Sequence, residues 1–496
     1  MTATNDPAIH ERFHFQDAAA LRRKAVALGL DLPFSERIEG LFEKAELAER
    51  AVANRLAIHP MEGADARPDG SPGPLTERRY RRFGAGGCGI IWFEAAAVVP
   101  EGRSNPGQLL LQETTLDGFS RLIEATRDAA DVAETNPPPL LILQLTHSGR
   151  FSRPTGKSAP LIARHDPVLD SLSGLPADHP LIDDDFLDRL SEKFGAAAAL
   201  AQRAGFDGVD MKACHGYLAA ELLAARRREG RYGGPLENRS RFLIQAFRAA
   251  RAEASRFILA CRLGVFDGLD GGFGVKGRAF AAELDPQAKL GAPAARTRPR
   301  SYSRSSTAEL DPQAKLGAPA AVDAEHSAVP DMSEPIEVVR QLATLGVSLL
   351  NITAGIPAHR PQIGRPFDVP PRGAAFPDEH PLAGVARLLN LAARAQREFP
   401  SLPVVGTGYS WLRGFFPRVA AGTLSRGGAR FIGLGRLAFA CPDFALRLRE
   451  EGELDRTRTC IACSECSALL RAGGPVGCVV RDANRYHRRT ASSARD

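Results

Sequence analysis

Three residues that can do chemistry lie close together in the stretch DGVDMKACHGYL, residues 207–218. Lys212, His215 and Tyr217 follow a short apolar run, which is typical of the end of a buried strand. Lys212 stands out because only 8 of the 64 basic residues are lysines. A buried ammonium is a compact point charge whose pKa shifts with its surroundings, whereas a guanidinium stays charged. The simpler alternative is a lysine whose stem lies on the strand end while its head stays in water.

Cysteines near the C-terminus form a second group. Their spacing is C-x2-C-x2-C-x11-C, with the residues Cys460, Cys463, Cys466 and Cys478. Three thiolates at that pitch, followed by a distant fourth, indicate a 4Fe-4S cluster, whereas a zinc site more often has two separated C-x2-C pairs. We therefore expect an iron-sulfur cluster, with zinc as the alternative.

Composition excludes several classes of protein. The 496 residues carry a formal net charge of +6, with 58 acidic residues spread among 64 basic ones. That balance is too mild and too dispersed for a nucleic-acid-binding surface. The N-terminal residues lack the apolar core of a signal peptide, and no later apolar run approaches the roughly 18 residues of a membrane helix. We expect a cytoplasmic protein that binds neither nucleic acid nor membrane.

Short apolar runs alternate with amphipathic helical stretches along the chain. Near-continuous apolar strands joined by helices indicate a parallel sheet that is covered on both faces. Eight such units favour a closed (β/α)8 TIM barrel over an open sheet, so the predicted fold class is α/β. The expected strands are residues 55–60, 88–99, 139–147, 206–213, 256–263, 347–354, 402–408 and 429–435.

Polar residues and glycines stand at the ends of these expected strands. Because the strands of a parallel barrel end on one face, such residues share the face where barrel active sites form. Lys212 and His215 end the fourth strand, and the sequences GTG (406–408) and GLGR (433–436) end the last two. Glycines there let backbone N–H groups approach an anion, and barrels commonly bind phosphate at this place. Taken alone, each glycine pair is more often a tight turn.

Six motifs follow one another between about residues 50 and 450. They are NRLAIHPMEG, GGCGIIWFEAAAVVPEGR, LQLTHSGR, DMKACHGYL, RYGGPLENRSRF and GLGR. In this order they resemble the old yellow enzyme family of FMN-dependent oxidoreductases. The resemblance implies a TIM barrel that holds FMN at its C-terminal mouth.

The resemblance also implies which residues hold FMN. The ring would be held by the backbone near Pro60 and Met61 and by Ala96, Gln144 and Arg262. The phosphate would be bound by Gly408, Gly435 and Arg436. A cation such as Arg262 stabilises negative charge on a reduced ring, and the Gln144 amide can both donate to and accept from its polar edge.

The catalytic residues are implied in the same way. Family members usually have a histidine at the position of Lys212 and a histidine or asparagine at that of His215. The resemblance implies that this pair donates hydrogen bonds to a substrate oxygen and that Tyr217 protonates a nearby carbon. Hydride transfer to an enone or enoyl thioester builds an enolate, which preorganised donors stabilise. Since Lys212 brings a full charge, we expect a substrate oxygen that is anionic when bound or in the transition state.

The cysteine spacing resembles the larger members of the family, such as 2,4-dienoyl-CoA reductase and trimethylamine dehydrogenase. Those relatives continue into a dinucleotide-binding module, whereas no glycine-rich fingerprint follows Cys478 here. We expect electrons to pass through a separate electron-transfer protein or to come directly from NAD(P)H, and either route is compatible with a homo-oligomer. The expected organisation is an N-terminal helical extension (1–48), an FMN-binding barrel (49–455) and an iron-sulfur segment (456–496).

A duplicated stretch interrupts the expected barrel between its fifth and sixth strands. AELDPQAKLGAPAA occurs at 282–295 and again at 308–321. We expect a low-complexity loop insertion over about residues 275–332, because loops accept extra length at little cost in stability.

The leading hypothesis is an FMN-dependent reductase of an activated C=C bond in a small molecule. One alternative is an amine or ether dehydrogenase that passes electrons through the cluster to an electron-transfer flavoprotein. Another is an electron-transfer subunit without substrate chemistry, against which the retained His215 and Tyr217 argue. An aromatic cage would suit a cationic amine. Lys212 would repel such a cation, so the sequence favours an electron-poor, oxygen-bearing substrate.

Overall fold

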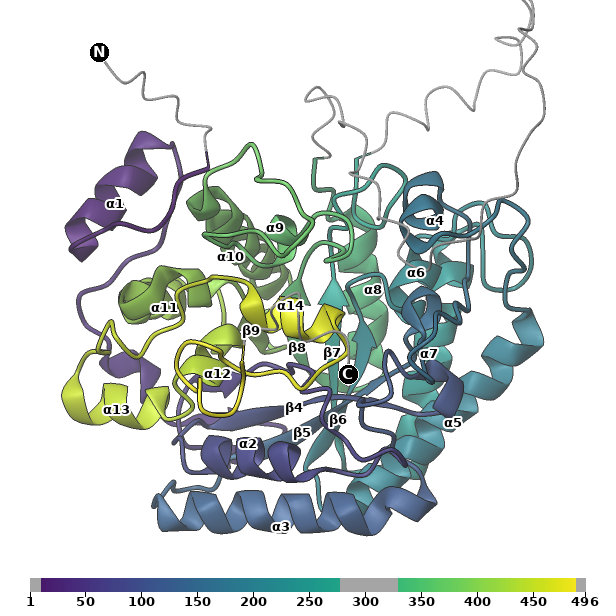
Figure 1. The fold of residues 1–496 in the computed structure, drawn as a ribbon, viewed down its shortest axis with the longest axis horizontal. Coiled ribbons are helices and arrows are strands. Elements are labelled where there is room, and N and C mark those ends of the chain that lie inside the picture. The colour runs from purple at the N-terminus through teal and green to yellow at the C-terminus, as the bar shows by residue number, and fades with distance from the viewer. Residues whose placement is uncertain (1–9, 277–328, 488–496) are drawn as a thin grey trace, which may run out of the picture.

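The strands of the protein close into a parallel barrel. The computed structural model describes residues 10–276 and 329–487, and the duplicated stretch lies outside these residues. The strand order around the barrel is β10-β3-β4-β5-β6-β7-β8-β9 (Figure 1). The barrel is therefore wound in chain order, and its last strand pairs with its first. The α/β TIM-barrel prediction and all eight expected strands are confirmed.

The barrel strands are shorter than the apolar runs that predicted them. Their bounds are β3 Leu56–Ile58, β4 Ile90–Ala97, β5 Leu140–Thr146, β6 Gly208–Ala213, β7 Ile258–Gly264, β8 Val347–Thr353, β9 Val404–Gly406 and β10 Phe431–Leu434. Residues of several runs continue past the strand end into the loops of the mouth. The polar residues at the ends of these runs therefore lie in loops, where both backbone and side chain are available to a ligand.

Helices cover the outside of the barrel. The longer ones are α2 Pro74–Gly84, α3 Leu116–Val132, α5 Asp184–Ala204, α7 Leu236–Glu253, α8 Ser333–Thr344, α10 Pro381–Glu398, α11 Phe416–Ser425 and α13 Phe444–Glu451. Short helices lie in the loops between them: α4 Pro167–Ser173, α6 Leu218–Leu223, α9 Pro361–Gly364 and α12 Arg436–Ala440. Helix α5 illustrates the local rules, since the Asp183 side chain caps its first turn and Gly205 ends it with φ +97°.

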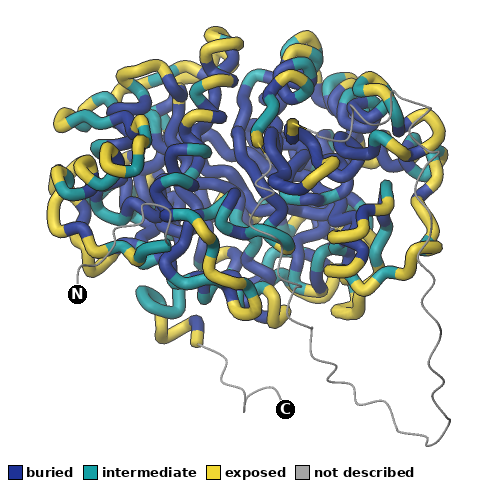
Figure 2. Tube along the Cα trace, turned by 90° about the horizontal axis from the view of Figure 1, so that it is seen from above, coloured by how far each residue is buried: buried dark blue, intermediate teal, exposed yellow. Residues whose placement is uncertain are grey.

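Two apolar cores stabilise the barrel. The larger one lies between the strands and the helices, and the smaller one fills the inside of the barrel with residues such as Trp92 and Ile142. A hairpin of β1 Ala45–Leu47 and β2 Arg50–Val52 adds Leu47 and Val52 to the inner core. The buried chain forms one continuous interior that exposed loops surround (Figure 2). The hairpin closes one end of the barrel, so the other end, where the strands have their carboxyl ends, is the end available to a ligand.

Segments before and after the barrel pack on it. Helix α1 Ala18–Ala27 precedes the hairpin, and helix α14 Glu465–Arg471 follows the barrel in the yellow segment of Figure 1. The Asp482 carboxylate pairs with Arg78 of α2 at 2.7 Å, and the Val476 N–H donates to the Gly63 oxygen at 2.7 Å. The C-terminal segment therefore contacts the loop that follows β3.

The two ends of the insertion meet. The Lys276 N–H donates to the Val329 oxygen at 2.9 Å, and the Asp331 N–H donates to the Gly274 oxygen at 2.8 Å. The chain thus leaves and rejoins the barrel at one place between β7 and α8. Among the helices of the described residues, none is long and apolar enough to cross a membrane.

Candidate active site and cysteine cavity

Lys212 and Tyr217 meet at the mouth of the barrel around a carboxylate that was not expected. Lys212 ends β6, and its Nζ lies 2.9 Å from Glu62 Oε1 in the loop after β3. The Tyr217 hydroxyl donates to the same oxygen at 2.9 Å, and the Ser104 hydroxyl donates to Oε2 at 3.0 Å. Lys212 Nζ also lies 3.4 Å from the centre of the Tyr217 ring, a cation–π contact. Two of the three predicted catalytic residues therefore form one cluster with Glu62.

The loop that carries Glu62 is held by buried charges. Its Gly63 N–H donates to the Glu94 carboxylate at 2.6 Å, and Arg79 pairs with both Glu94 and Asp65. Arg79 fills the space beside Gly63, because an added Cβ would lie 2.0 Å from its Nη2. A buried arginine between two carboxylates is stable only while its partners remain in place. This network fixes the loop and gives Glu62 a defined position.

His215 lies beside this cluster in a left-handed backbone conformation, with φ +64°. Its Nε2 is 3.3 Å from the Thr353 hydroxyl at the end of β8. Burial, and then the charges of Arg262 and Lys212, hold the pKa of His215 well below its usual value of 6.5. The imidazole is therefore neutral near pH 7 and donates through only one nitrogen.

The cluster has a defined protonation state. Burial alone would raise the pKa of Glu62, but the Lys212 charge and three hydrogen bonds outweigh it and leave that pKa below 4.5. Burial and the neighbouring carboxylate raise the pKa of Tyr217 well above 10. Near neutral pH, Glu62 is thus a carboxylate and Tyr217 a neutral phenol. The Lys212 charge that the sequence predicted is matched by an opposite charge.

A second buried carboxylate lies deeper inside the barrel. Asp210 Oδ2 accepts from Gln144 Nε2 at 2.5 Å and from Trp92 Nε1 at 3.0 Å. Its Oδ1 accepts from the Arg262 backbone N–H at 2.5 Å. Asp210 therefore ties together β4, β5, β6 and β7 directly below the mouth. One N–H of the Gln144 amide is used by Asp210, which leaves its second N–H and its carbonyl oxygen for a ligand.

The predicted Ala96 does not face the interior. It belongs to the outer core, whereas its neighbour Ala95 is in register with the inward-facing Gln144. Register partners in a parallel ladder point to the same face of the sheet. The structure thus brings Ala95, and not Ala96, to the inner side of the mouth, where Pro60 and Met61 also lie.

Two predicted cofactor-binding arginines have donors to spare. Arg262 Nη1 donates to the Pro60 oxygen at 3.1 Å, and Arg436 Nη2 donates to the Pro366 oxygen at 2.6 Å. Arg262 Nε and Arg436 Nη1 are buried and have no hydrogen-bond partner among the described residues. Buried donors are nearly always paired in folded proteins. Each of these two atoms therefore fits an anionic or oxygen-rich group as its partner.

The two predicted phosphate-site glycines lie at the ends of neighbouring strands. Gly408 follows β9 with φ +111°, and Gly435 follows β10. An added Cβ on Gly435 would lie 2.8 Å from the Met61 sulfur. The backbone at the ends of the last two strands thus comes close to the loop after β3. An elongated ligand that spans the mouth could therefore contact both.

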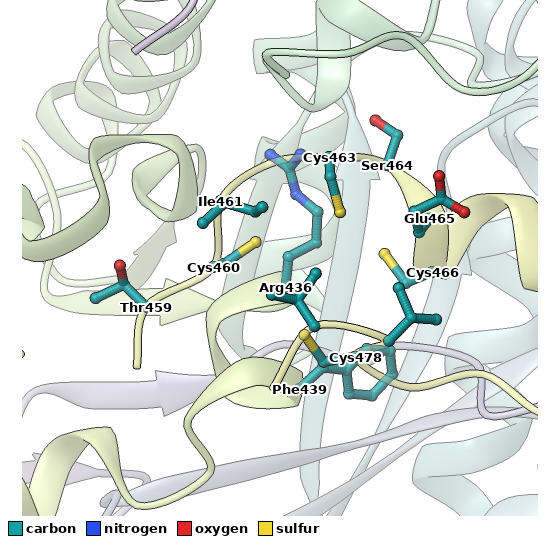
Figure 3. A pocket seen from close by; sticks show the side chains of 12 residues that line it. Arg436, Phe439, Thr459, Cys460, Ile461, Cys463, Ser464, Glu465, Cys466 and Cys478 are labelled. Carbon is teal, nitrogen blue, oxygen red and sulfur yellow. The ribbon is translucent and has the colours of Figure 1, made fainter. Parts of the chain in front are cut away.

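The four motif cysteines line one cavity (Figure 3). The Arg436 side chain extends into the same cavity, between Cys460 and Cys463 in this view. Positive φ angles at Ala462 and Ser464, of +53° and +61°, curl the loop around it. The cavity thus adjoins the expected phosphate site through Arg436.

Backbone donors point at two of these sulfurs. The Ala462 N–H lies 3.4 Å from Cys460 Sγ, and the Arg481 N–H lies 3.4 Å from Cys478 Sγ. Hydrogen bonds to cysteine sulfurs are a feature of iron-sulfur sites. Within residues 10–276 and 329–487, no group of three or more histidine, cysteine or acidic side chains is arranged to hold a single metal ion. The thiolates of a four-iron cluster stand further apart than those around one zinc, since each binds its own iron.

Sequence reasoning missed three residues of this site. The sequence did contain a signal for Asp210. It lies two positions before Lys212, and because the side chains of a strand alternate between faces, the two residues share a face. Glu62 follows the motif residues Pro60 and Met61, but nothing in the sequence pairs it with a lysine 150 positions away. Thr353 could be recognised only as one of several polar residues at the ends of the expected strands.

A closed parallel barrel whose polar side chains gather at one mouth places the chain among the TIM-barrel proteins, whose active sites form at that end. Residues 40–291 match the NADH:flavin oxidoreductase / NADH oxidase family, and the chain belongs to that family. The chain is similar to NADPH dehydrogenase of Bacillus subtilis (strain 168), with 30% identity over 207 residues. It is also similar to NADH oxidase of Thermoanaerobacter brockii, with 27% identity over 237 residues.

These matches cover only part of each protein. The first spans 41% of this chain and 57% of the Bacillus protein, and the second spans 47% and 35%. The chain thus spans between 35% and 57% of the length of these two relatives, within a family of NADH:flavin oxidoreductases.

Solved structures share the fold at low sequence identity. A 2-naphthoyl-CoA reductase complex has a TM-score of 0.63 at 19% identity, over 90% of this chain and 57% of its own. Histamine dehydrogenase from Rhizobium sp. 4-9 has a TM-score of 0.60 at 18% identity, over 89% and 52%. The old yellow enzyme homologue from Zymomonas mobilis has a TM-score of 0.56 at 19% identity, over 84% and 94%. At these identities the likeness establishes the barrel fold alone.

Asp210 should make stability depend on pH. Burial raises the pKa of Asp210 from 3.8 to about 6, so the folded protein holds this proton more tightly than the unfolded chain does. Its contribution is therefore fully present below about pH 4 and is lost as the pH rises through about 6. A shift of that size corresponds to roughly 3 kcal/mol.

The variant Asp210→Asn has no such proton to lose. Between about pH 4 and pH 8, the free energy of unfolding of the wild type should fall by roughly 3 kcal/mol relative to the variant. Urea unfolding of both proteins across this range measures the difference. Two stability curves that run parallel at every pH would contradict the assignment.

Proposed function

We propose that the chain reduces an activated C=C bond by hydride transfer from FMN, with an enone or enoyl thioester as substrate. The observation that carries this proposal is the arrangement at the mouth, where Lys212 and Tyr217 meet at Glu62 and His215, from the same segment at the end of β6, contacts Thr353. All three can donate a hydrogen bond to a substrate oxygen or a proton to a carbon. An electron-transfer subunit without substrate chemistry, the other alternative from the sequence, would not require these three donors.

The cofactor residues belong to the same proposal. We assign the ring to Pro60, Met61, Gln144 and Arg262, with Ala95 in place of the expected Ala96, and the phosphate to Gly408, Gly435 and Arg436. When bound, FMN supplies the hydride. The unpartnered donors on Arg262 and Arg436 support this placement, because each would find an acceptor at one end of the cofactor.

The chain's own residues then carry the proton and charge chemistry. Lys212 and the neutral His215 donate to the substrate oxygen, where negative charge develops during hydride transfer. Tyr217, kept protonated by its raised pKa, gives a proton to the carbon next to the carbonyl. In the resting structure its hydroxyl donates to Glu62, so the O–H bond must turn towards the substrate before transfer.

We propose that the four cysteines bind a 4Fe-4S cluster. Their common cavity and the two N–H donors to sulfur support a cluster. Arg436 reaches from the expected FMN phosphate into this cavity, so the two centres would be neighbours. That arrangement supports exchange of electrons with a separate electron-transfer protein, with NAD(P)H as the other reductant. The proposal also includes a cytoplasmic location and a homo-oligomer.

An amine dehydrogenase is the second candidate, because one observation removes an argument against it. The Lys212 charge was expected to repel a cationic amine, but Glu62 lies 2.9 Å from that ammonium and cancels it. A histamine dehydrogenase is among the structures that share the fold. Lys212, His215 and Tyr217 can each donate a hydrogen bond to a substrate oxygen, so reduction of an oxygen-bearing substrate remains the better-supported function.

The variant Lys212→Met tests the reductase proposal. Losing a preorganised donor to a developing oxyanion typically lowers kcat by a factor of roughly 100 to 1000. NAD(P)H-dependent reduction of cyclohexenone should fall accordingly, while reduction of FMN by NAD(P)H alone should change little. The exposed Lys193 offers the matched control, since Lys193→Met should retain the wild-type rate. Equal kcat and KM in the wild type and Lys212→Met would contradict the role.

The variant Cys460→Ser tests the cluster. A serine at one of four ligand positions should lower the iron and sulfide content of anaerobically purified protein and weaken its broad visible absorbance. The control is Cys441→Ser, because Cys441 is buried outside the motif and donates to Asp443. Zinc in place of iron, or full iron content in Cys460→Ser, would overturn the assignment.

A further inference from the structure

Glu62 accepts three hydrogen bonds at the mouth, and the proposed reaction gives it no task. Its two oxygens accept from Lys212 and Tyr217, which follow one another at the end of β6, and from Ser104 of a separate segment. The side chains of Lys212 and Glu62 are only 5% and 9% exposed. A carboxylate buried to this extent is retained at a cost in desolvation, so its position invites a functional explanation.

The positive charge of Lys212 is balanced inside the mouth. Its ammonium lies 2.9 Å from the Glu62 carboxylate. His215 is neutral. Lys212 therefore offers a substrate oxygen a donor whose charge is already compensated.

We propose that Glu62 determines substrate specificity by cancelling the charge of Lys212, so that the enzyme selects uncharged alkenes over those that carry a carboxylate near the reacting bond. This inference rests on the proposed function and adds the substrate class. It also replaces the expectation, drawn from Lys212 alone, that the bound substrate oxygen is anionic.

Hydrogen-bond geometry gives the physical reason. An ammonium has three N–H donors, and Glu62 takes one of those on Lys212. A neutral carbonyl oxygen can accept another while the ion pair stays intact. An anion that approaches the same nitrogen also meets the Glu62 carboxylate 2.9 Å from it, and like charges brought together in a poorly solvated site repel strongly. Discrimination against anions follows from this repulsion.

Tyr217 is positioned by the same carboxylate. Its hydroxyl donates to Glu62 and its ring lies against the Lys212 ammonium, so the phenol is held in one orientation before substrate binds. An uncharged substrate leaves the Lys212–Glu62 pair intact, so the phenol ring stays in place until its O–H bond turns towards the substrate. An anion that displaced Glu62 from Lys212 would also remove the acceptor of the Tyr217 proton.

The test compares acetylacrylate with its methyl ester, two activated alkenes that differ by one charge. The readout is the ratio of kcat/KM for the ester to kcat/KM for the acid. We expect this ratio to fall by at least roughly tenfold in Glu62→Gln, which keeps the side-chain volume but removes the negative charge. In Lys212→Met, which leaves Glu62 uncompensated, the ratio should rise.

Ser104→Ala is the matched control, because it removes a hydrogen bond from Glu62 without changing any charge. Its ratio should stay within about twofold of the wild type. An unchanged ratio in both Glu62→Gln and Lys212→Met would overturn the inference, and opposite shifts of the two variants support it.

Failure of the proposed function would look different. If no variant reduces either alkene, binding of benzoate and of benzamide is followed through the visible spectrum of the flavin. The preference for benzamide should then be lost in Glu62→Gln, and a retained preference would overturn the charge argument independently of turnover.

Discussion

The ion pair between Lys212 and Glu62 is the interaction on which the mouth of the barrel depends. It joins the end of β6 to the loop after β3, two places that are far apart in the sequence and separated by β4 and β5 in the barrel wall but that meet across the mouth. Neither charge is stable alone at this depth, because removing one partner leaves the other buried and uncompensated. The pair therefore fixes the loop, and through the shared carboxylate it also fixes Tyr217.

A polar layer beneath the mouth supports this arrangement. Asp210 connects four strands of the barrel through Trp92, Gln144 and the Arg262 backbone. Below it the interior is apolar and is closed by the hairpin. The barrel is thus apolar at one end and polar at the other, so the groups that can stabilise developing charge lie together at the mouth.

The fold could be predicted because its signals are local. Each barrel strand is a short apolar run, and the helices between them carry their own caps and apolar stripes. The order of the motifs likewise led to the correct family. Such features depend on residues that are neighbours in the sequence.

The site could be predicted only in part, because its contacts depend on distant residues and on register. Lys212, His215 and Tyr217 lie on one segment, so their proximity was visible, whereas the partner Glu62 was not. The assignment of Ala96 missed by one position, because a bulge between Phe93 and Ala95 reverses the alternation of faces along β4. The sequence alone contains no sign of such a bulge.

Anaerobic stopped-flow absorbance tests the central claim most directly. The account predicts that the purified protein contains FMN, that NAD(P)H bleaches it, and that cyclohexenone then restores the oxidised spectrum rapidly. Folded protein without FMN, or reduced flavin that no uncharged activated alkene reoxidises, would contradict it.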